Sequence, residues 1–162
     1  MIPHIKILIL NWNGCELTLN CLKSVLQLDY SNFSVSVIDN GSYDDSINSI
    51  KKSFPEVEIL ELQENVGFSM GYNYAFSKMR TQKIDYYWIL NNDTTVSKKA
   101  IFYFLNSVKI YGEKHIYGSL INYMDKPSII WYAGAKVDLF WGILSHNLIR
   151  KPMDLTEIKN LN

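Results

Sequence analysis

The segment 86–95, YYWILNNDTT, has the residues best suited to chemistry. Five apolar or aromatic residues run directly into Asn91, Asn92 and Asp93. The unbroken run predicts a strand buried on both faces, and ligands bind beyond the carboxyl ends of strands in open α/β sheets. An Asn-x-Asp cluster there offers oxygen atoms to a hard divalent cation such as Mg²⁺ or Mn²⁺. The alternative is a simple turn in which Asp93 or Thr94 caps the next helix.

A second polar cluster, Asn11-Trp12-Asn13-Gly14, follows the apolar run IKILIL at 5–10. Asparagine and glycine predict a tight loop after a buried strand. Trp12 beside two amides offers a ring face and polar edges to a planar ligand. The alternative is a turn around a core tryptophan.

The third cluster, Asp39-Asn40-Gly41-Ser42, follows the alternating strand pattern of 33–38. Ser42, followed three residues later by an acidic residue, fits a helix cap. Asp39 lies before that cap and is not needed for it. We therefore expect its carboxylate to accept a hydrogen bond from a sugar hydroxyl or a base N–H.

The fourth cluster, 65–73, contains Gly67 and Gly71 at the predicted start of a helix. Their spacing is not the Gly-x-Gly-x-x-Gly fingerprint of dinucleotide-binding proteins, which argues against a dehydrogenase. The glycines allow close approach of backbone to a phosphate or sugar, or tight packing of the helix on the sheet. Asn73, one turn into the helix, suits a ligand hydrogen bond better than packing.

The four clusters lie between elements that alternate in type. Strands are predicted at 5–10, 33–38, 57–62, 86–90 and 116–121, with helices at 17–28, 44–54, after Gly67, and 97–111. This alternation predicts an α/β fold with a mostly parallel central sheet flanked by helices on both faces, formed as one domain over residues 1–162. Because parallel strands end at the same edge, the clusters should converge there.

Composition restricts the function classes. The chain of 162 residues has 16 basic and 16 acidic residues, so it lacks the positive charge expected for non-specific nucleic-acid binding. Cys15 and Cys21 fall on different faces of one predicted helix, too far apart for a disulfide. Free thiols and no recognisable signal peptide predict a cytoplasmic protein. No apolar segment is long enough to span a bilayer.

The aromatic segment 129–142, IIWYAGAKVDLFWG, admits two interpretations. It forms a hairpin or loop whose aromatic side chains stack on a sugar or base, or it makes a core or subunit contact. The second interpretation includes self-association of the chain as a homo-oligomer.

The four clusters, in this order, resemble the family 2 glycosyltransferases of GT-A fold, and among them the rhamnosyltransferase-like branch, which makes bacterial surface polysaccharides. The segments that carry the resemblance are ILILNWNG at 7–14, VIDNGSYDDS at 37–46, ENVGFSMGYNYA at 64–75 and WILNNDT at 88–94. It covers about the first 140 residues, and the four motifs together are specific.

The resemblance implies roles for individual residues. The loop formed by Asn11, Trp12 and Asn13 would border the nucleotide base, and Asp39, with Asn40 and Gly41, would bind uracil or thymine. The donor sugar and nucleotide would be lined by residues of the fourth cluster, namely Asn65, Gly67, Phe68 and Asn73. Asn91, Asn92 and Asp93 stand where the family has Asp-x-Asp, so Asp93 and Asn91 would hold Mg²⁺ or Mn²⁺ at the diphosphate.

The implied reaction is a metal-dependent, inverting transfer of a sugar, of hexosyltransferase type, from a UDP- or dTDP-linked donor to a saccharide or lipid-linked saccharide. A lipid-linked acceptor would place the protein at the inner face of the membrane, in peripheral association with it. The family's catalytic base lies in a second half that this sequence does not match, so we expect the base beyond Asn162. The alternative is a non-catalytic nucleotide-sugar binding module or a truncated product. A nucleotidyltransferase is disfavoured because the 11–14 loop has no Lys or Arg for a triphosphate.

Overall fold

A computed structural model describes residues 2–154 of the chain. Two compact units divide it, residues 1–106 and residues 107–162.

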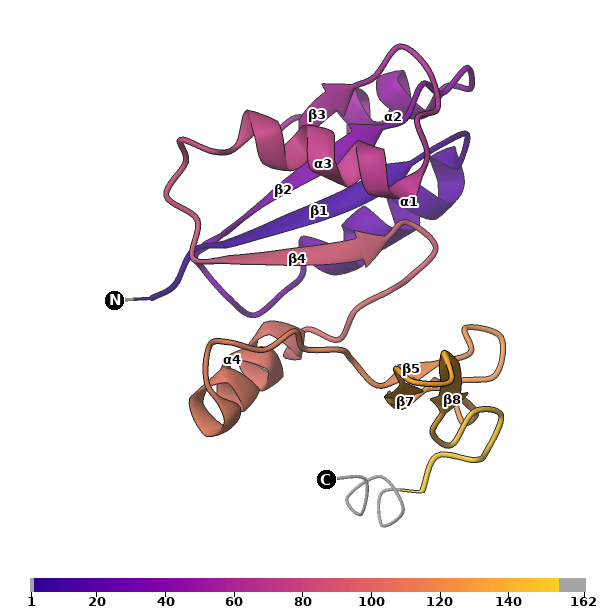
Figure 1. The fold of residues 1–162 in the computed structure, drawn as a ribbon. Coiled ribbons are helices and arrows are strands. Elements are labelled where there is room, and N and C mark those ends of the chain that lie inside the picture. Colours follow the sequence, from indigo (N-terminus) through magenta and orange to yellow (C-terminus); the bar gives the residue numbers. More distant parts are fainter. Residues whose placement is uncertain (1, 155–162) are drawn as a thin grey trace. The chain divides into compact units, whose positions relative to one another are not determined.

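The first unit is built on a four-stranded sheet with the order β3-β2-β1-β4. Its strands are β1 (Ile5–Asn11), β2 (Phe33–Asp39), β3 (Glu58–Glu61) and β4 (Tyr86–Asn91). All three strand pairs are parallel, and β1 lies between β2 and β4. The four strands therefore end at one edge of the sheet (Figure 1).

Helices cover both faces of this sheet (Figure 1). Helices α1 (Cys15–Val25) and α2 (Ser46–Ser53) bury their apolar sides against one face, where Ile7, Ile9 and Val37 form the larger core cluster. Helix α3 (Phe68–Lys78) packs on the opposite face, against Leu8 and Ile38. Neighbouring strand residues thus point to opposite cores, as the period of a β-strand requires. The predicted fold class is confirmed.

The strand β4 differs from the prediction in its burial. Tyr87 and Ile89 are 41% and 47% exposed, whereas Leu90 is buried. The strand lies at the edge of the four-stranded sheet, with β1 as its one neighbour in that sheet, so its side chains are flanked by strand residues on one side only. An unbroken apolar run does not distinguish a central strand from an edge strand.

Helix α4 (Ala100–Tyr111) begins in the first unit, where Ile101 is buried in the larger core cluster and Phe104 stacks edge-on against Trp88. It ends in the second unit, where the Tyr117 hydroxyl donates to the Gly112 carbonyl at 2.5 Å. None of the helices within residues 2–154 is long and apolar enough to cross a membrane.

The second unit contains two small antiparallel sheets. Strand β5 (Ile121–Asn122) pairs with β6 (Ile130–Tyr132), and β7 (Ala135–Asp138) pairs with β8 (Ile143–His146). The prediction that 116–121 adds a fifth strand to the parallel sheet is wrong. Only Ile121 of that segment is in a strand, and its partner is Tyr132 of the aromatic segment 129–142. This segment does not form a hairpin by itself, because its strand β6 pairs with β5 and its strand β7 pairs with β8, which begins at Ile143.

Candidate functional site

The order of the strands creates a switch point beside β1. The chain proceeds from β1 to β2 and β3 on one side, and then returns to place β4 on the other side. At such a reversal, the loops after the two neighbouring strands diverge and leave a crevice for a ligand. The loops that follow β1 and β4 are two of the four polar clusters, Asn11–Gly14 and Asn91–Asp93.

Asn11 is the centre of the hydrogen-bond network at this edge, and it is fully buried. Its side-chain amide donates to Asp39 Oδ1 at 2.8 Å and to the Ser42 hydroxyl at 3.1 Å. Its side-chain oxygen accepts from Thr18 at 2.7 Å and from Asn92 at 3.3 Å. One side chain therefore connects the ends of β1, β2 and β4 with helix α1.

Asp39 is 1% exposed. Besides the bond from Asn11, its Oδ2 accepts from the Ser42 backbone amide at 2.9 Å. Each carboxylate oxygen thus has one protein donor and retains one lone pair. Ser42 belongs to the 41–43 loop, so this loop is bonded directly to the buried carboxylate.

Trp12 and Asn13 form the outer part of the β1 loop. Trp12 is 52% exposed, so it is not the core tryptophan of the alternative interpretation. Asn13 adopts a positive φ of 50°, and its side-chain oxygen accepts from the Tyr43 amide at 2.9 Å. The first and third clusters are therefore joined into one rigid rim with an exposed indole ring.

Gly41 is required by this rim. Its φ is +74°, and a Cβ at this position would lie 2.6 Å from backbone atoms of Glu64. Ser42 does not cap the next helix as predicted, because α2 begins only at Ser46, preceded by Asp45. The Ser42 hydroxyl instead accepts from the Asn13 amide at 2.9 Å, a tertiary contact that a local capping pattern does not reveal.

Asn40 ties the third cluster to the fourth. It is 2% exposed, its side-chain amide donates to Asn65 Oδ1 at 2.9 Å, and its side-chain oxygen accepts from the Val66 amide at 3.0 Å. Asn65 Oδ1 also accepts from the Gly67 amide at 2.8 Å. These bonds shape the loop that leads into helix α3.

Gly67 and Gly71 have different surroundings. A Cβ on Gly71 would lie 2.7 Å from Leu10 Cδ1, so Gly71 lets α3 pack on the sheet. Gly67, with a φ of +81°, has open space where its Cβ would lie and precedes the first turn of α3.

Phe68 is 55% exposed, and Asn73 is exposed, so both are accessible to a ligand.

The turn after β4 separates its three polar residues. Asn91 and Asp93 are exposed. The Asn92 side chain points inward, since its amide donates to Thr18 at 3.0 Å. The capping alternative is excluded because α4 begins only at Ala100.

The donor set of this turn fits a divalent cation shared with a diphosphate. Asp93 supplies a carboxylate and Asn91 an amide oxygen, both hard ligands of the kind that Mg²⁺ and Mn²⁺ prefer. Within residues 2–154 no three His, Cys, Asp or Glu side chains gather closely enough to hold a metal by themselves. Phosphate oxygens and water would have to complete the coordination, as Mg²⁺ commonly requires.

Two buried acids lie beside the turn. Burial raises the pKa of Cys21 to about 11, helped by the charge of Asp93 and opposed by a hydrogen bond with Thr94. Burial likewise raises the pKa of Tyr72, whose hydroxyl donates to the Leu90 carbonyl, to about 12. Both groups stay protonated at neutral pH, so neither serves as a catalytic base or nucleophile there.

Thr18 is the site residue that sequence reasoning missed. It is fully buried in α1, among the apolar residues of that helix. The available signal was the helical spacing of Thr18 from the apolar residues Leu22 and Val25, because a hydroxyl buried with them needs a polar partner.

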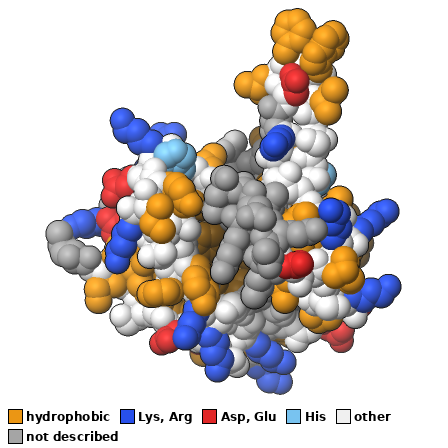
Figure 2. All heavy atoms as spheres, turned by 90° about the horizontal axis from the view of Figure 1, so that it is seen from below, with side chains coloured by type: hydrophobic (Ala, Val, Ile, Leu, Met, Phe, Trp, Pro, Cys, Tyr) orange, Lys and Arg blue, Asp and Glu red, His pale blue; other side chains and the backbone are white. Residues whose placement is uncertain are grey.

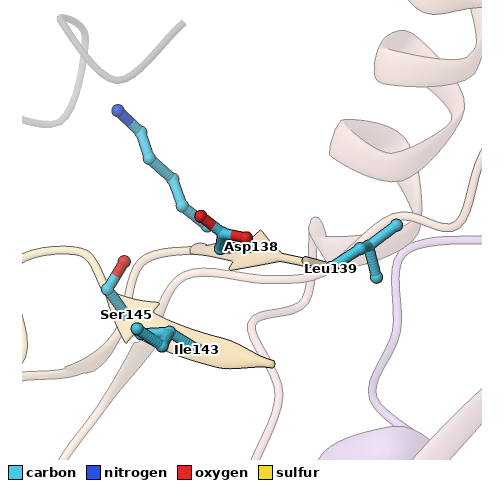
Figure 3. A pocket seen from close by; sticks show the side chains of 5 residues that line it. Asp138, Leu139, Ile143 and Ser145 are labelled. Atoms are coloured by element: carbon cyan, nitrogen blue, oxygen red, sulfur yellow. The ribbon is translucent and has the colours of Figure 1, made fainter. Parts of the chain in front are cut away.

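The second unit has a shallow hollow on one face of the β7–β8 hairpin, lined by Lys136, Asp138, Leu139, Ile143 and Ser145 (Figure 3). None of these is a predicted site residue. In the turn between β7 and β8, Phe140 and Trp141 are 87% and 72% exposed. Hydrophobic side chains are also exposed in several places between lysines and arginines in the view of Figure 2.

Comparison with known proteins identifies the family. A family model described as glycosyl transferase family 2 matches residues 6–158, so the chain belongs to this family. No curated protein matches the sequence.

Solved structures share the fold. The mannosyltransferase PcManGT from Pyrobaculum calidifontis, in complex with GDP-Man and Mn²⁺, is 19% identical with a TM-score of 0.61, over 76% of this chain and 36% of that chain. S. aureus TarS 1–349 in complex with UDP-GlcNAc is 12% identical with a TM-score of 0.59, over 76% of this chain and 41% of that chain. The chain thus matches well under half the length of these structures.

Proposed function

We propose that the chain is a nucleotide-sugar binding domain, acting as the donor part of a glycosyltransferase that transfers a sugar from a UDP- or dTDP-linked donor to a saccharide acceptor. The observation that carries the proposal is the convergence of the β1 and β4 loops at the switch point. A buried amide–carboxylate network supports a base-binding rim there, and an exposed Asp93 lies on the adjacent loop.

In this proposal the exposed ring of Trp12 and the amide of Asn13 border the base. Asp39, with Asn40 and Gly41 beside it, accepts the base N–H after the 41–43 loop shifts. The donor sugar and its ribose lie against Asn65, Gly67, Phe68 and Asn73. Burial of Asp39 makes its carboxylate selective, since a base without a suitably placed donor leaves that acceptor unpaired.

Asp93 and Asn91 would hold Mg²⁺ or Mn²⁺ against the diphosphate. When bound, the cation neutralises charge on the departing diphosphate. The acceptor hydroxyl attacks the anomeric carbon opposite that leaving group, which inverts the configuration. Cys21 and Tyr72 stay protonated at neutral pH, so neither is the base that takes the hydroxyl proton.

The wider role rests on the resemblance of the four motifs. We assign the reaction to hexosyl transfer in bacterial surface polysaccharide synthesis, in the cytoplasm at the inner face of the membrane. The exposed Leu139, Phe140 and Trp141 support either peripheral contact with a membrane that holds a lipid-linked acceptor or self-association.

Thermal unfolding with UDP, dTDP and GDP, each with and without Mn²⁺, tests the proposal. A ligand at a hundred times its dissociation constant adds about 2.7 kcal/mol to the free energy of unfolding. For a domain of this size the expected rise in Tm is roughly 5 to 10 °C. A metal-dependent rise with UDP or dTDP, but not GDP, supports the proposal. No rise with any of them contradicts it, and binding without sugar transfer to any acceptor favours a non-catalytic module.

A further inference from the structure

Three side chains form a closed hydrogen-bonded triangle behind the candidate site. The Thr18 hydroxyl donates to Asn11 Oδ1 at 2.7 Å and accepts from Asn92 Nδ2 at 3.0 Å. The third side joins Asn92 Nδ2 to Asn11 Oδ1 at 3.3 Å. The triangle links helix α1, the loop after β1 and the turn after β4.

The surrounding structure leaves room for this triangle. A Cβ on Gly14 would lie 2.6 Å from Asn92 Nδ2 and 3.2 Å from Asn11 Oδ1, so only glycine lets the Asn92 side chain enter. Thr18 and Asn11 are both fully buried. A buried, fully paired polar group holds its neighbours in one arrangement, because any other leaves it unpaired.

The turn that this triangle holds has few other anchors at its tip. The Thr94 hydroxyl donates to the Asn91 carbonyl at 2.7 Å, which is a bond within the turn itself. Asp93 is exposed, and no hydrogen bond from another described residue fixes its carboxylate. The backbone of the turn is held through Asn92 and by two bonds with helix α1, from Cys21 Sγ to the Asn91 carbonyl at 3.7 Å and from the Val96 amide to the Ser24 hydroxyl at 3.1 Å. The position of the Asp93 carboxylate depends on these contacts, and Asn92 is the one that links the turn to both Thr18 and Asn11.

We propose that Thr18 is a positioning residue that couples cation binding at Asp93 to nucleotide binding at the β1 loop. The hydroxyl fixes the distance between the turn that carries the cation ligand and the loop that borders the base. A cation at Asp93 then lies within reach of the diphosphate of a nucleotide that is bound at the β1 loop. Binding needs no additional free energy to order the turn. This inference rests on the proposed function of the same site.

The test is a set of variants measured for their affinity for UDP by calorimetry, with and without Mn²⁺. Thr18→Val keeps the shape of the side chain but removes its donor and acceptor, and Thr18→Ser keeps the hydroxyl. The control is Thr95→Val, because Thr95 is an exposed threonine just after the same turn. The quantity compared is the factor by which Mn²⁺ tightens UDP binding.

We expect Thr18→Val to reduce this factor about tenfold, the effect of one lost hydrogen bond. Thr18→Ser and Thr95→Val should keep it within about twofold. Asn92→Ala removes the hydrogen bond to Thr18 by changing its other partner, the residue in the turn after β4. It gives a second measurement if Thr18→Val folds poorly. The double variant with Thr18→Val and Asn92→Ala should reduce the factor no further than either single variant, because both substitutions remove the same hydrogen bond between Thr18 and Asn92.

Two results overturn the inference, and they differ. If Thr18→Val and Asn92→Ala lower Tm but leave the Mn²⁺ factor unchanged, the triangle only stabilises the fold. If the unaltered protein binds UDP, dTDP and GDP equally poorly with and without Mn²⁺, the proposed function itself fails and this inference fails with it.

Discussion

Asn11 and Asp39 stand directly opposite each other on neighbouring parallel strands, and a 2.8 Å hydrogen bond joins their side chains. Each is the last residue of its strand, and neither is more than 1% exposed. A neutral amide donor thus faces a buried carboxylate where the sheet ends, and the carboxylate fixes which way the amide points.

Replacing Asp39 with asparagine tests this pair. Asparagine keeps the size of the side chain but turns one of its two acceptors into a donor, which then faces the donors Asn11 Nδ2 or Ser42 N. The expected cost is about 1 to 3 kcal/mol, or roughly 2 to 12 °C in Tm, measured by thermal unfolding. Asp125→Asn, an exposed control, should change the stability by less than about 0.5 kcal/mol.

Removing the carboxylate of Asp93 separates ligand binding from folding. Because Asp93 is exposed, Asp93→Ala should leave the free energy of unfolding within about 0.5 kcal/mol. It should abolish the additional Tm rise that Mn²⁺ produces with UDP or dTDP. A rise equal to that of the unaltered protein would remove Asp93 from the cation site.

Gly41 and Gly67 form a matched pair for the rim of the site. Both have positive φ, but a Cβ on Gly41 would meet the Glu64 backbone at 2.6 Å, whereas a Cβ on Gly67 would meet nothing within 4 Å. Gly67→Ala should cost about 1 to 3 kcal/mol, because a φ of +81° with a ψ of 177° lies in a region that residues other than glycine rarely adopt. Gly41→Ala combines a positive φ with a clash against backbone atoms that cannot rotate away, which adds about 1 to 3 kcal/mol. Equal losses of Tm in the two variants would contradict the close approach of Glu64.

Glu58 makes stability depend on pH. It accepts hydrogen bonds from Lys6, which is 4% exposed, and from the Ser36 hydroxyl. Burial raises the pKa of the Glu58 carboxyl, but the hydrogen bonds from Ser36 and Lys6 and the charge of Lys6 outweigh it, so the pKa lies below its ordinary 4.5. The stabilisation is therefore complete above pH 4.5 and is lost as the pH falls through the lowered pKa.

Urea unfolding at pH 7 and pH 3 checks this dependence. Glu58→Gln should be less stable than the unaltered protein at pH 7 by about 0.5 to 1 kcal/mol, because the Glu58 side chain is 43% exposed and solvent screens the ion pair. The difference should narrow at pH 3. Glu56→Gln, at an exposed position two residues earlier, should show little change at either pH. A constant deficit for Glu58→Gln would mean that the carboxylate charge is not what stabilises the pair.

The sequence predicted the fold because its signals are local. The spacing of apolar residues predicted the four strands of the parallel sheet and the helices between them to within a few residues. The polar residues after β1 and β4 indicated the edge of the sheet where the candidate site lies. The prediction that β4 is buried on both faces was wrong. Whether an apolar strand has a neighbouring strand on both sides depends on segments that are distant in the sequence.

The hydrogen bonds between side chains of the candidate site could not be predicted from the sequence. Asn92 and Ser42 have side chains that suit a ligand contact or a helix cap, but here they bond to Thr18 and Asn13 on other elements. Such pairs depend on the register of β1 against β2 and β4, which no single segment encodes. The roles of the exposed residues toward a ligand stay predictions.

The place of β1 in the sheet has a consequence for synthesis of the protein on the ribosome. The first strand to emerge has β2 on one side and must wait for β4, a much later segment, on the other. Until residues 86–91 leave the ribosome, one edge of an apolar strand is unpaired, which is the kind of edge that other chains recognise. The same late event brings Asn92 to Thr18, so a nascent chain becomes able to form the candidate site only when this open edge is closed.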